Sequence, residues 1–129
     1  IIATALDQGF GPKAREVAKK LLSEGGEIIA VHVVQPVNEV VESFVTEDAK
    51  SKARETIKDM MAERLRDEKN IESVILSGHP GSEIPAYAKK VGADCIIVGS
   101  HKPGLQDFFL GSTSSRIVRH AECAVHVLR

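Results

Sequence analysis

The residues best placed to do chemistry stand in the last third of the chain, where two glycines flank a loop. The apolar run 95–98 leads into Gly99, and a second glycine, Gly111, opens the hydroxyl-rich run 112–115. If a strand ends at the first glycine and a helix begins at the second, backbone N–H groups and hydroxyls gather at a helix N-terminus, which favours an anion such as phosphate. The same residues also fit a plain turn at Gly111 with Ser112 as an ordinary N-cap, and their spacing alone favours neither interpretation.

Other familiar chemical motifs do not match this chain. The glycine spacing fits neither the Walker pattern nor the dinucleotide fingerprint. The serines lack a Gly-x-Ser-x-Gly elbow, so no catalytic nucleophile is expected. The histidines show no zinc-motif spacing, so no metal site is expected; His32 and His126 fall in strand-like runs and His120 near a helix end, where structural roles are commoner.

Composition indicates one ordinary globular domain over residues 1–129, with 43% hydrophobic and 27% charged residues. The formal net charge is −1, from 17 basic and 18 acidic residues, so no strong field attracts nucleic acid or an anionic membrane. With no Trp and one Tyr, a base-stacking platform is poorly supplied. No apolar run approaches a membrane span, no targeting segment is visible, and we expect a cytoplasmic protein. Cys95 and Cys123 are too few for a disulfide framework, and Cys95 reads as a buried reduced thiol.

Apolar runs and helical periodicities alternate along the chain. Strands are expected over 1–6, 28–34, 71–76, 94–98 and 124–128, and helices from Pro12 to the Gly25-Gly26 pair, over 47–67, from Ser82 to Gly92, and over 112–120, with an irregular connection at 35–46. The alternation predicts an α/β fold, a doubly wound parallel sheet with helices on both faces. In such a sheet ligands bind beyond the carboxyl ends of the strands, where Asp7, 33–34 and 99–102 converge.

The periodicity also predicts which side chains of the helices face the core and where one of the helices begins and ends. Apolar stripes are expected at Ala14, Val17, Ala18, Leu21 and Leu22 in the first helix, and at Ala53, Ile57, Met60, Met61 and Leu65 in the second. Ser82 is expected to be the N-cap of the third helix, which Gly92 ends.

The whole chain resembles the universal stress protein family. The resemblance rests on the strand-Asp start, His32-Val33 after the second strand, Gly-x-Pro before the third helix, and the run strand-Gly-Ser-His-loop-Leu-Gly-Ser-helix-Arg-His-Ala. The chain is similar to the small single-domain form, in particular the enterobacterial F and G subgroups. The resemblance implies a five-stranded sheet of order 3-2-1-4-5, a Rossmann-like arrangement of the adenine nucleotide alpha hydrolase type, and a dimer.

The resemblance also implies an adenine nucleotide site, residue by residue. Asp7 matches the acidic residue that contacts the nucleoside, although a strand-end cap is its plain alternative. Ala5 matches a neighbouring backbone position, and Val33 matches the residue whose main chain reads the adenine edge. The remaining matches are the loop after the fourth strand and the phosphate-binding amides and hydroxyls: Val98, Gly99, His101, Lys102, Gly111, Ser112 and Thr113.

The chain departs from the family's ATP-binding signature, Gly-x-x-Gly, nine residues, Gly-Ser/Thr. Lys102 stands where the second glycine is expected, the loop is one residue shorter, and Gly104 arrives two positions late. We expect Lys102 to supply a positive partner to the phosphates, because an ammonium near polyphosphate is electrostatically favourable.

The resulting prediction is a dimeric regulatory stress-response protein that holds ATP, or ADP or AMP, with or without Mg²⁺. Two alternatives remain open: an interaction module that has lost nucleotide affinity, and a slow ATP hydrolase, for which the chain offers no convincing general base. We expect a homodimer through the strand that contains Val125 and Val127, whose alternative is a strand covered by its own helices.

Overall fold

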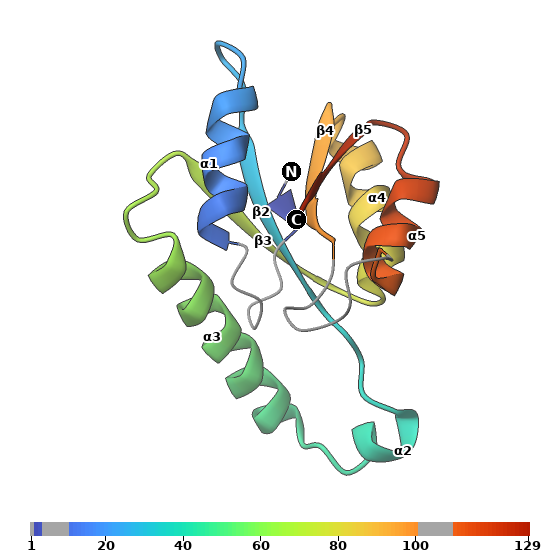
Figure 1. Cartoon of the computed structure of the whole chain (residues 1–129). Coiled ribbons are helices and arrows are strands. Elements are labelled where there is room, and N and C mark those ends of the chain that lie inside the picture. The colour runs from blue at the N-terminus through green and yellow to red at the C-terminus, as the bar shows by residue number, and fades with distance from the viewer. Residues whose placement is uncertain (1, 4–10, 101–109) are drawn as a thin grey trace.

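The computed structural model describes residues 2–3, 11–100 and 110–129 (Figure 1). The strands are β1 (Ile2–Ala3), β2 (Ile28–Val34), β3 (Ile71–Ser77), β4 (Cys95–Gly99) and β5 (Ala124–Leu128). The helices are α1 (Gly11–Leu21), α2 (Glu39–Glu42), α3 (Glu47–Arg64), α4 (Pro80–Val91) and α5 (Ser112–His120). The structure thus confirms an α/β fold of parallel strands alternating with helices.

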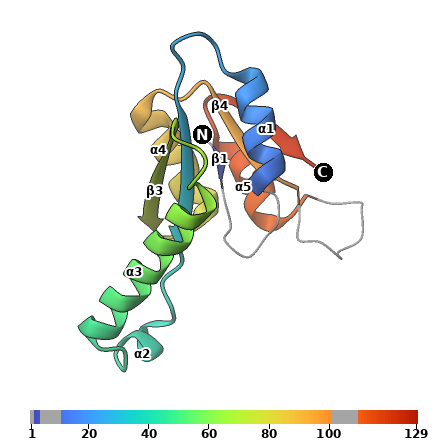
Figure 2. The ribbon, with the colours of Figure 1, turned by 90° about the vertical axis from the view of Figure 1, so that its left-hand side faces the viewer.

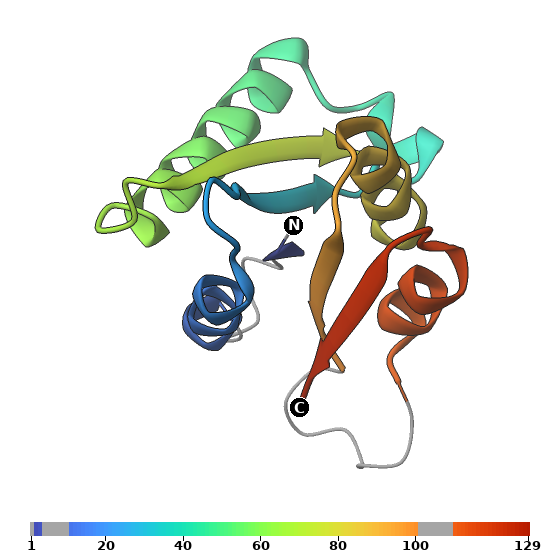
Figure 3. The ribbon, with the colours of Figure 1, turned by 90° about the horizontal axis from the view of Figure 1, so that it is seen from above.

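The strands pair in the order β3-β2-β1-β4-β5, and every pair is parallel. The described part of β1 lies at the centre, where Ile2 is opposite Ala30 of β2 and Ile97 of β4. Seen from above, the sheet twists strongly between β3 and β5 (Figure 3). Because all strands run the same way, their carboxyl ends share one edge, the edge at which the nucleotide residues are expected.

Alternate residues of the central strands pack on opposite faces of the sheet. Val31 and Val33 of β2 join Ile96 and Val98 of β4 in a core with α4 and α5. The intervening residues face the other side, where Ile28 and Ile97 pack with α1 and Ala30 packs with Met61 of α3. Burial on both faces explains why β2 and β4 are continuous apolar runs rather than alternating ones.

Helix α4 begins earlier than expected, and Ser82 is not its N-cap. His79 caps the helix: its backbone is extended (φ −91°, ψ 120°) and its Nδ1 accepts a hydrogen bond from the N–H of Gly81 at 3.1 Å. Pro80 then occupies the first helical position, where its missing N–H costs nothing and its φ already suits a helix. Gly92 ends the helix as expected, in a left-handed conformation at φ 66°.

Two expected helical stripes are only partly buried. Met61 is buried but Met60 is 42% exposed, and Leu21 and Leu22 are 54% and 41% exposed. Helix α1 ends at Leu21, so Leu22 already lies beyond the helix, and the buried stripe stops at Ala18. A hydrophobic side chain on a helical stripe is buried only where another element lies opposite it.

The remaining differences concern connections and the sheet edge. The connection 35–46 contains the short helix α2, and α3 ends at Arg64, three residues before the expected end. At the edge strand β5, Val125 and Val127 are partly buried against the core beneath α4 and α5. In the described part of the chain, no helix combines the length and the hydropathy needed to cross a membrane.

Candidate functional site

The carboxyl end of β4 is joined directly to the start of α5. The N–H of Gly111 donates to the carbonyl of Ser100 at 2.7 Å, and the N–H of Ser100 donates to the carbonyl of Leu128 at 2.8 Å. Ser100 itself is 2% exposed. These bonds bring Gly99 and Gly111 to the same edge of the sheet, as the two-glycine pattern predicts.

Ser114 forms the second connection between β4 and α5. Its Oγ donates to the carbonyl of Gly99 at 2.5 Å, and the residue is 4% exposed. The sequence pattern counts the Ser114 hydroxyl, with the rest of the run 112–115, among those that could face a phosphate, and the structure instead directs it inward to β4. The missing signal was its helical spacing, because Ser114 stands three residues before the fully buried Ile117 and therefore shares its inward face.

Gly111, not Ser112, is the N-cap of α5. The cap has φ −57° and ψ 158°, and among the described residues no side chain caps the helix. Ser112 is therefore the first helical residue and is exposed, while Thr113 is half-buried. The first N–H groups of a helix lack intrahelical acceptors, so an anion placed here would meet N–H donors, the positive end of the helix dipole and two hydroxyls.

Val33 and Val98 present only their main chains at this edge. Both side chains are buried, at 8% and 6% exposed, in the core between the sheet and α4 and α5. A ligand at the carboxyl ends of β2 and β4 would meet their backbone N–H and C=O groups. This geometry suits the main-chain role expected for Val33.

Six of the ten expected site residues are described: Val33, Val98, Gly99, Gly111, Ser112 and Thr113. The structure brings the last four together at the junction of β4 and α5 and places Val33 on β2, with β1 between. The other four, Ala5, Asp7, His101 and Lys102, lie outside the described residues.

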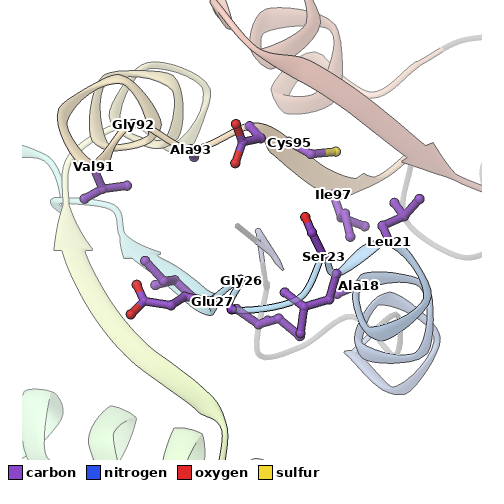
Figure 4. A pocket seen from close by; sticks show the side chains of 15 residues that line it. Ala18, Leu21, Ser23, Gly26, Glu27, Val91, Gly92, Ala93, Cys95 and Ile97 are labelled. Atoms are coloured by element: carbon purple, nitrogen blue, oxygen red, sulfur yellow. The ribbon is translucent and has the colours of Figure 1, made fainter.

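A cavity of about 310 Å³ opens at the opposite, amino-terminal edge of the sheet (Figure 4). It lies between the end of α1 and the start of β2 on one side and the end of α4 and the start of β4 on the other. Ile2 pairs with Ala30 and Ile97, so the first residues of β2 and β4 extend past the described part of β1 and form the walls. None of the six described site residues lines this cavity, and we assign it no ligand.

Within the described ranges, neither cysteine forms a disulfide and no group of three or more His, Cys, Asp or Glu side chains could hold a metal ion. Cys95 and Cys123 are half-buried thiols. Burial, followed by the neighbouring Cys95, raises the pKa of the Cys123 thiol above its ordinary value, which favours the protonated form.

Comparison with known proteins gives a family and a set of related folds. The family model described as "Universal stress protein family" matches residues 10–129. Universal stress protein G of Shigella flexneri is 30% identical over 83 residues, which are 64% of this chain and 58% of that protein. The chain therefore spans less than two thirds of the length of this relative.

Solved structures resemble nearly the whole chain. The structure of the hypothetical protein MJ0577 has a TM-score of 0.79 and 26% identity, with 98% of this chain and 93% of that chain covered. A universal stress protein from Archaeoglobus fulgidus in complex with dAMP has a TM-score of 0.66 at 17% identity, with 99% and 94% covered. A universal stress protein in complex with cAMP has a TM-score of 0.64 at 15% identity, with 99% and 93% covered. At these low identities the last two comparisons establish the fold alone.

Proposed function

The chain belongs to the universal stress protein family, and we propose that it binds an adenine nucleotide at the carboxyl edge of the sheet, with the phosphates at the start of α5. The observation that carries the proposal is the uncapped first turn of α5, which two hydrogen bonds hold against the end of β4. Backbone N–H groups at a helix start that is held in place are preorganised for an anion. Two proteins of this fold have been solved with dAMP and with cAMP, which supports the choice of an adenine nucleotide.

The proposal gives each expected residue a part. The main chain of Val33 reads the adenine edge, and Asp7 with the backbone at Ala5 contacts the nucleoside. The phosphates lie along Gly99, Gly111, Ser112 and Thr113, and Val98 lends its main chain. His101 and Lys102 approach the phosphates from the loop, where a lysine ammonium balances phosphate charge.

We propose that the physiological nucleotide is ATP and that it is bound but not hydrolysed. Where Mg²⁺ is present, it binds to the phosphates. The frame is the doubly wound sheet of order 3-2-1-4-5, and the protein acts as a cytoplasmic regulatory homodimer. The partly buried Val125 and Val127 direct the proposed pairing to the outer backbone of the edge strand β5 rather than to their side chains. Light scattering at micromolar concentration tests the dimer, and a monomer would contradict it.

Calorimetric titration of nucleotide-stripped protein with ATP, AMP and GTP tests the proposal. We expect heat from ATP and AMP, and weaker ATP binding by Gly111→Val, whose branched side chain crowds the phosphate turn. Ser82→Val is the matched control, because Ser82 is an exposed residue in the first turn of α4 and is not among the expected site residues. Both variants should remain folded, with a small loss of stability in Gly111→Val because valine is a poorer N-cap than glycine.

Two outcomes would replace the proposal by its alternatives. No heat at millimolar ATP would leave an interaction module of the same fold. Sustained phosphate release that disappears in Asp7→Ala would make the protein a slow ATP hydrolase. Unchanged ATP affinity in Gly111→Val would remove the phosphates from this turn.

A further inference from the structure

The connection between β2 and α3 carries an exposed apolar stripe. Its members are Val37, Val40, Val41 and Phe44, which are 52%, 66%, 51% and 83% exposed. Val40, Val41 and Phe44 share one side of the helical turn formed by α2 and its continuation, and Val37 precedes the cap Asn38. In a globular domain such a stripe normally faces the core, so its exposure calls for a partner.

The backbone beneath the stripe is ordered as a helical turn. Asn38 caps α2 through its side chain, which accepts from the N–H of Val40 at 3.0 Å. The N–H groups of Glu42 and Ser43 donate to the carbonyls of Asn38 and Glu39, and the N–H of Phe44 continues the turn to Val41. The stripe is therefore presented on a formed surface rather than on an extended segment.

Helix α2 lies away from the sheet, beyond the carboxyl end of β2 and beside the start of α3 (Figures 1 and 2). No residue of α2 is buried. The two views agree that the sheet and its covering helices leave this surface open, so a separate molecule could reach the stripe.

Acidic residues accompany the stripe along the chain. Residues 36–49 contain Glu39, Glu42, Glu47 and Asp48 and no Lys, Arg or His. Lys50 pairs with Glu42 and Glu47, at 3.5 and 3.0 Å, and Lys52 pairs with Asp48 at 3.3 Å. With these two bases, residues 36–52 still carry a net charge of −2, four acids against two bases.

We propose that the stripe, together with its acidic flank, is a docking surface for a basic amphipathic helix of another protein. The apolar face of such a helix would cover the stripe, and its lysines or arginines would lie against Glu39 and its neighbours. A second copy meeting the same surface by twofold symmetry would bring acids against acids, which disfavours self-association here. The acidic flank likewise disfavours an anionic membrane.

The probe is a fluorescein-labelled peptide of leucine and lysine whose leucines recur with helical spacing, followed by fluorescence anisotropy. We expect Phe44→Ser to weaken binding about tenfold or more, because large aromatic side chains dominate such contacts. Glu39→Lys should weaken it through charge, and the affinity of the parent protein should fall as salt rises. A peptide of the same composition with strand-like alternation should bind less tightly.

Val118→Ser is the matched control, because Val118 is 44% exposed on α5, distant in sequence from the stripe. It should bind the peptide like the parent protein, and all variants should melt alike because the replaced side chains are exposed. Peptide affinity unchanged in Phe44→Ser would overturn the proposal. So would a smaller oligomer in Phe44→Ser by light scattering, since the stripe would then be covered by a second copy. ATP titration of the same variants keeps this test separate from the nucleotide site, because none of the replaced residues is among those proposed to hold the nucleotide: parent-like ATP affinity together with weaker peptide binding supports the docking surface.

Discussion

Replacing Ser114 with alanine tests whether α5 is anchored to β4 through one hydroxyl. The Ser114 Oγ donates to the carbonyl of Gly99 at 2.5 Å in a 4% exposed site. A hydrogen bond contributes about 1 kcal/mol net, and a buried carbonyl left without its partner costs about 1–3 kcal/mol. Alanine offsets part of this loss, up to roughly 0.5 kcal/mol, through its higher helix propensity. We therefore expect Ser114→Ala to lower the free energy of unfolding by about 1–2 kcal/mol.

Ser112→Ala is the matched control, two residues earlier on the same helix. Ser112 is exposed, so its loss should change the free energy of unfolding by less than about 0.5 kcal/mol. In urea titrations Ser114→Ala should lower the midpoint with an unchanged slope, and in thermal melts it should lower Tm by roughly 3–8 °C for a domain of this size.

Nucleotide titrations of the same two variants complete the test. Ser112→Ala should weaken ATP binding without loss of stability, because its hydroxyl lies at the proposed phosphate site. Ser114→Ala should weaken binding only through displacement of α5. A parent-like stability of Ser114→Ala would refute the anchoring role, and equal destabilisation by both variants would refute the division between inward and outward hydroxyls.

Three further changes test the frame of the fold. Gly92→Ala should cost about 1 kcal/mol in urea unfolding purely through backbone strain, because Gly92 has φ 66° and a Cβ there would meet no atom within 4 Å; an unchanged midpoint would contradict this origin. Gly81→Ala should cost about 1–3 kcal/mol, because its Cβ would lie 2.8 Å from Cδ and 2.9 Å from Cβ of Arg116 and push α4 from α5; a parent-like melt would show that the two helices separate freely. The hydrogen bond from Lys19 lowers the pKa of the Glu68 carboxyl. The ion pair therefore contributes to the free energy of unfolding above the ordinary carboxyl pKa, and this contribution is lost as pH falls through the lowered pKa. Glu68→Gln should flatten this part of the stability–pH curve, and an unchanged curve would exclude a contribution from the pair.

The sequence predicts the strands and α5 well because they are defined by burial. The observed bounds of β2, β5 and α5 equal the expected ones. The apolar run of β2 is covered on both faces, and β5 and α5 each have one buried side, which leaves little choice of register. The helix starts are harder, because several residues can serve as caps. At α4 the cap was expected at Ser82, but proline favours the first helical position, so Pro80 makes His79 the cap.

The exposed stripes at Leu21, Leu22 and Met60 could not be predicted from periodicity. A hydrophobic period reports which side chains share a helical face, but not where the sheet opposite that face ends. The stripe of Val37, Val40, Val41 and Phe44 could not be predicted as exposed for the same reason. No described helix or strand covers these four apolar residues.

The candidate site, too, could be predicted only in part from the sequence. Glycines and hydroxyls at a helix start are visible in sequence, whereas the hydrogen bonds that bring Gly111 to Ser100 and Ser114 to Gly99 depend on the end of a strand far from them along the chain. The sequence could therefore not decide between a plain turn capped by Ser112 and an anion site.

The structure changes that balance through the cap. Had Ser112 been the N-cap, its hydroxyl would have accepted a hydrogen bond from an N–H group of the first turn, and one fewer donor would have been left for an anion. With Gly111 in that position the cap has no side-chain oxygen, and no side-chain hydrogen bond replaces it. The Ser114 hydroxyl donates to the carbonyl of Gly99 in β4 and so holds the turn in place. Ser112 is exposed and Thr113 is half-buried, so neither residue belongs to the buried core. The run therefore divides into Ser114, which anchors the helix, and Ser112 and Thr113, which are proposed to bind. A helix start that no described side chain caps is the physical reason to expect phosphate there.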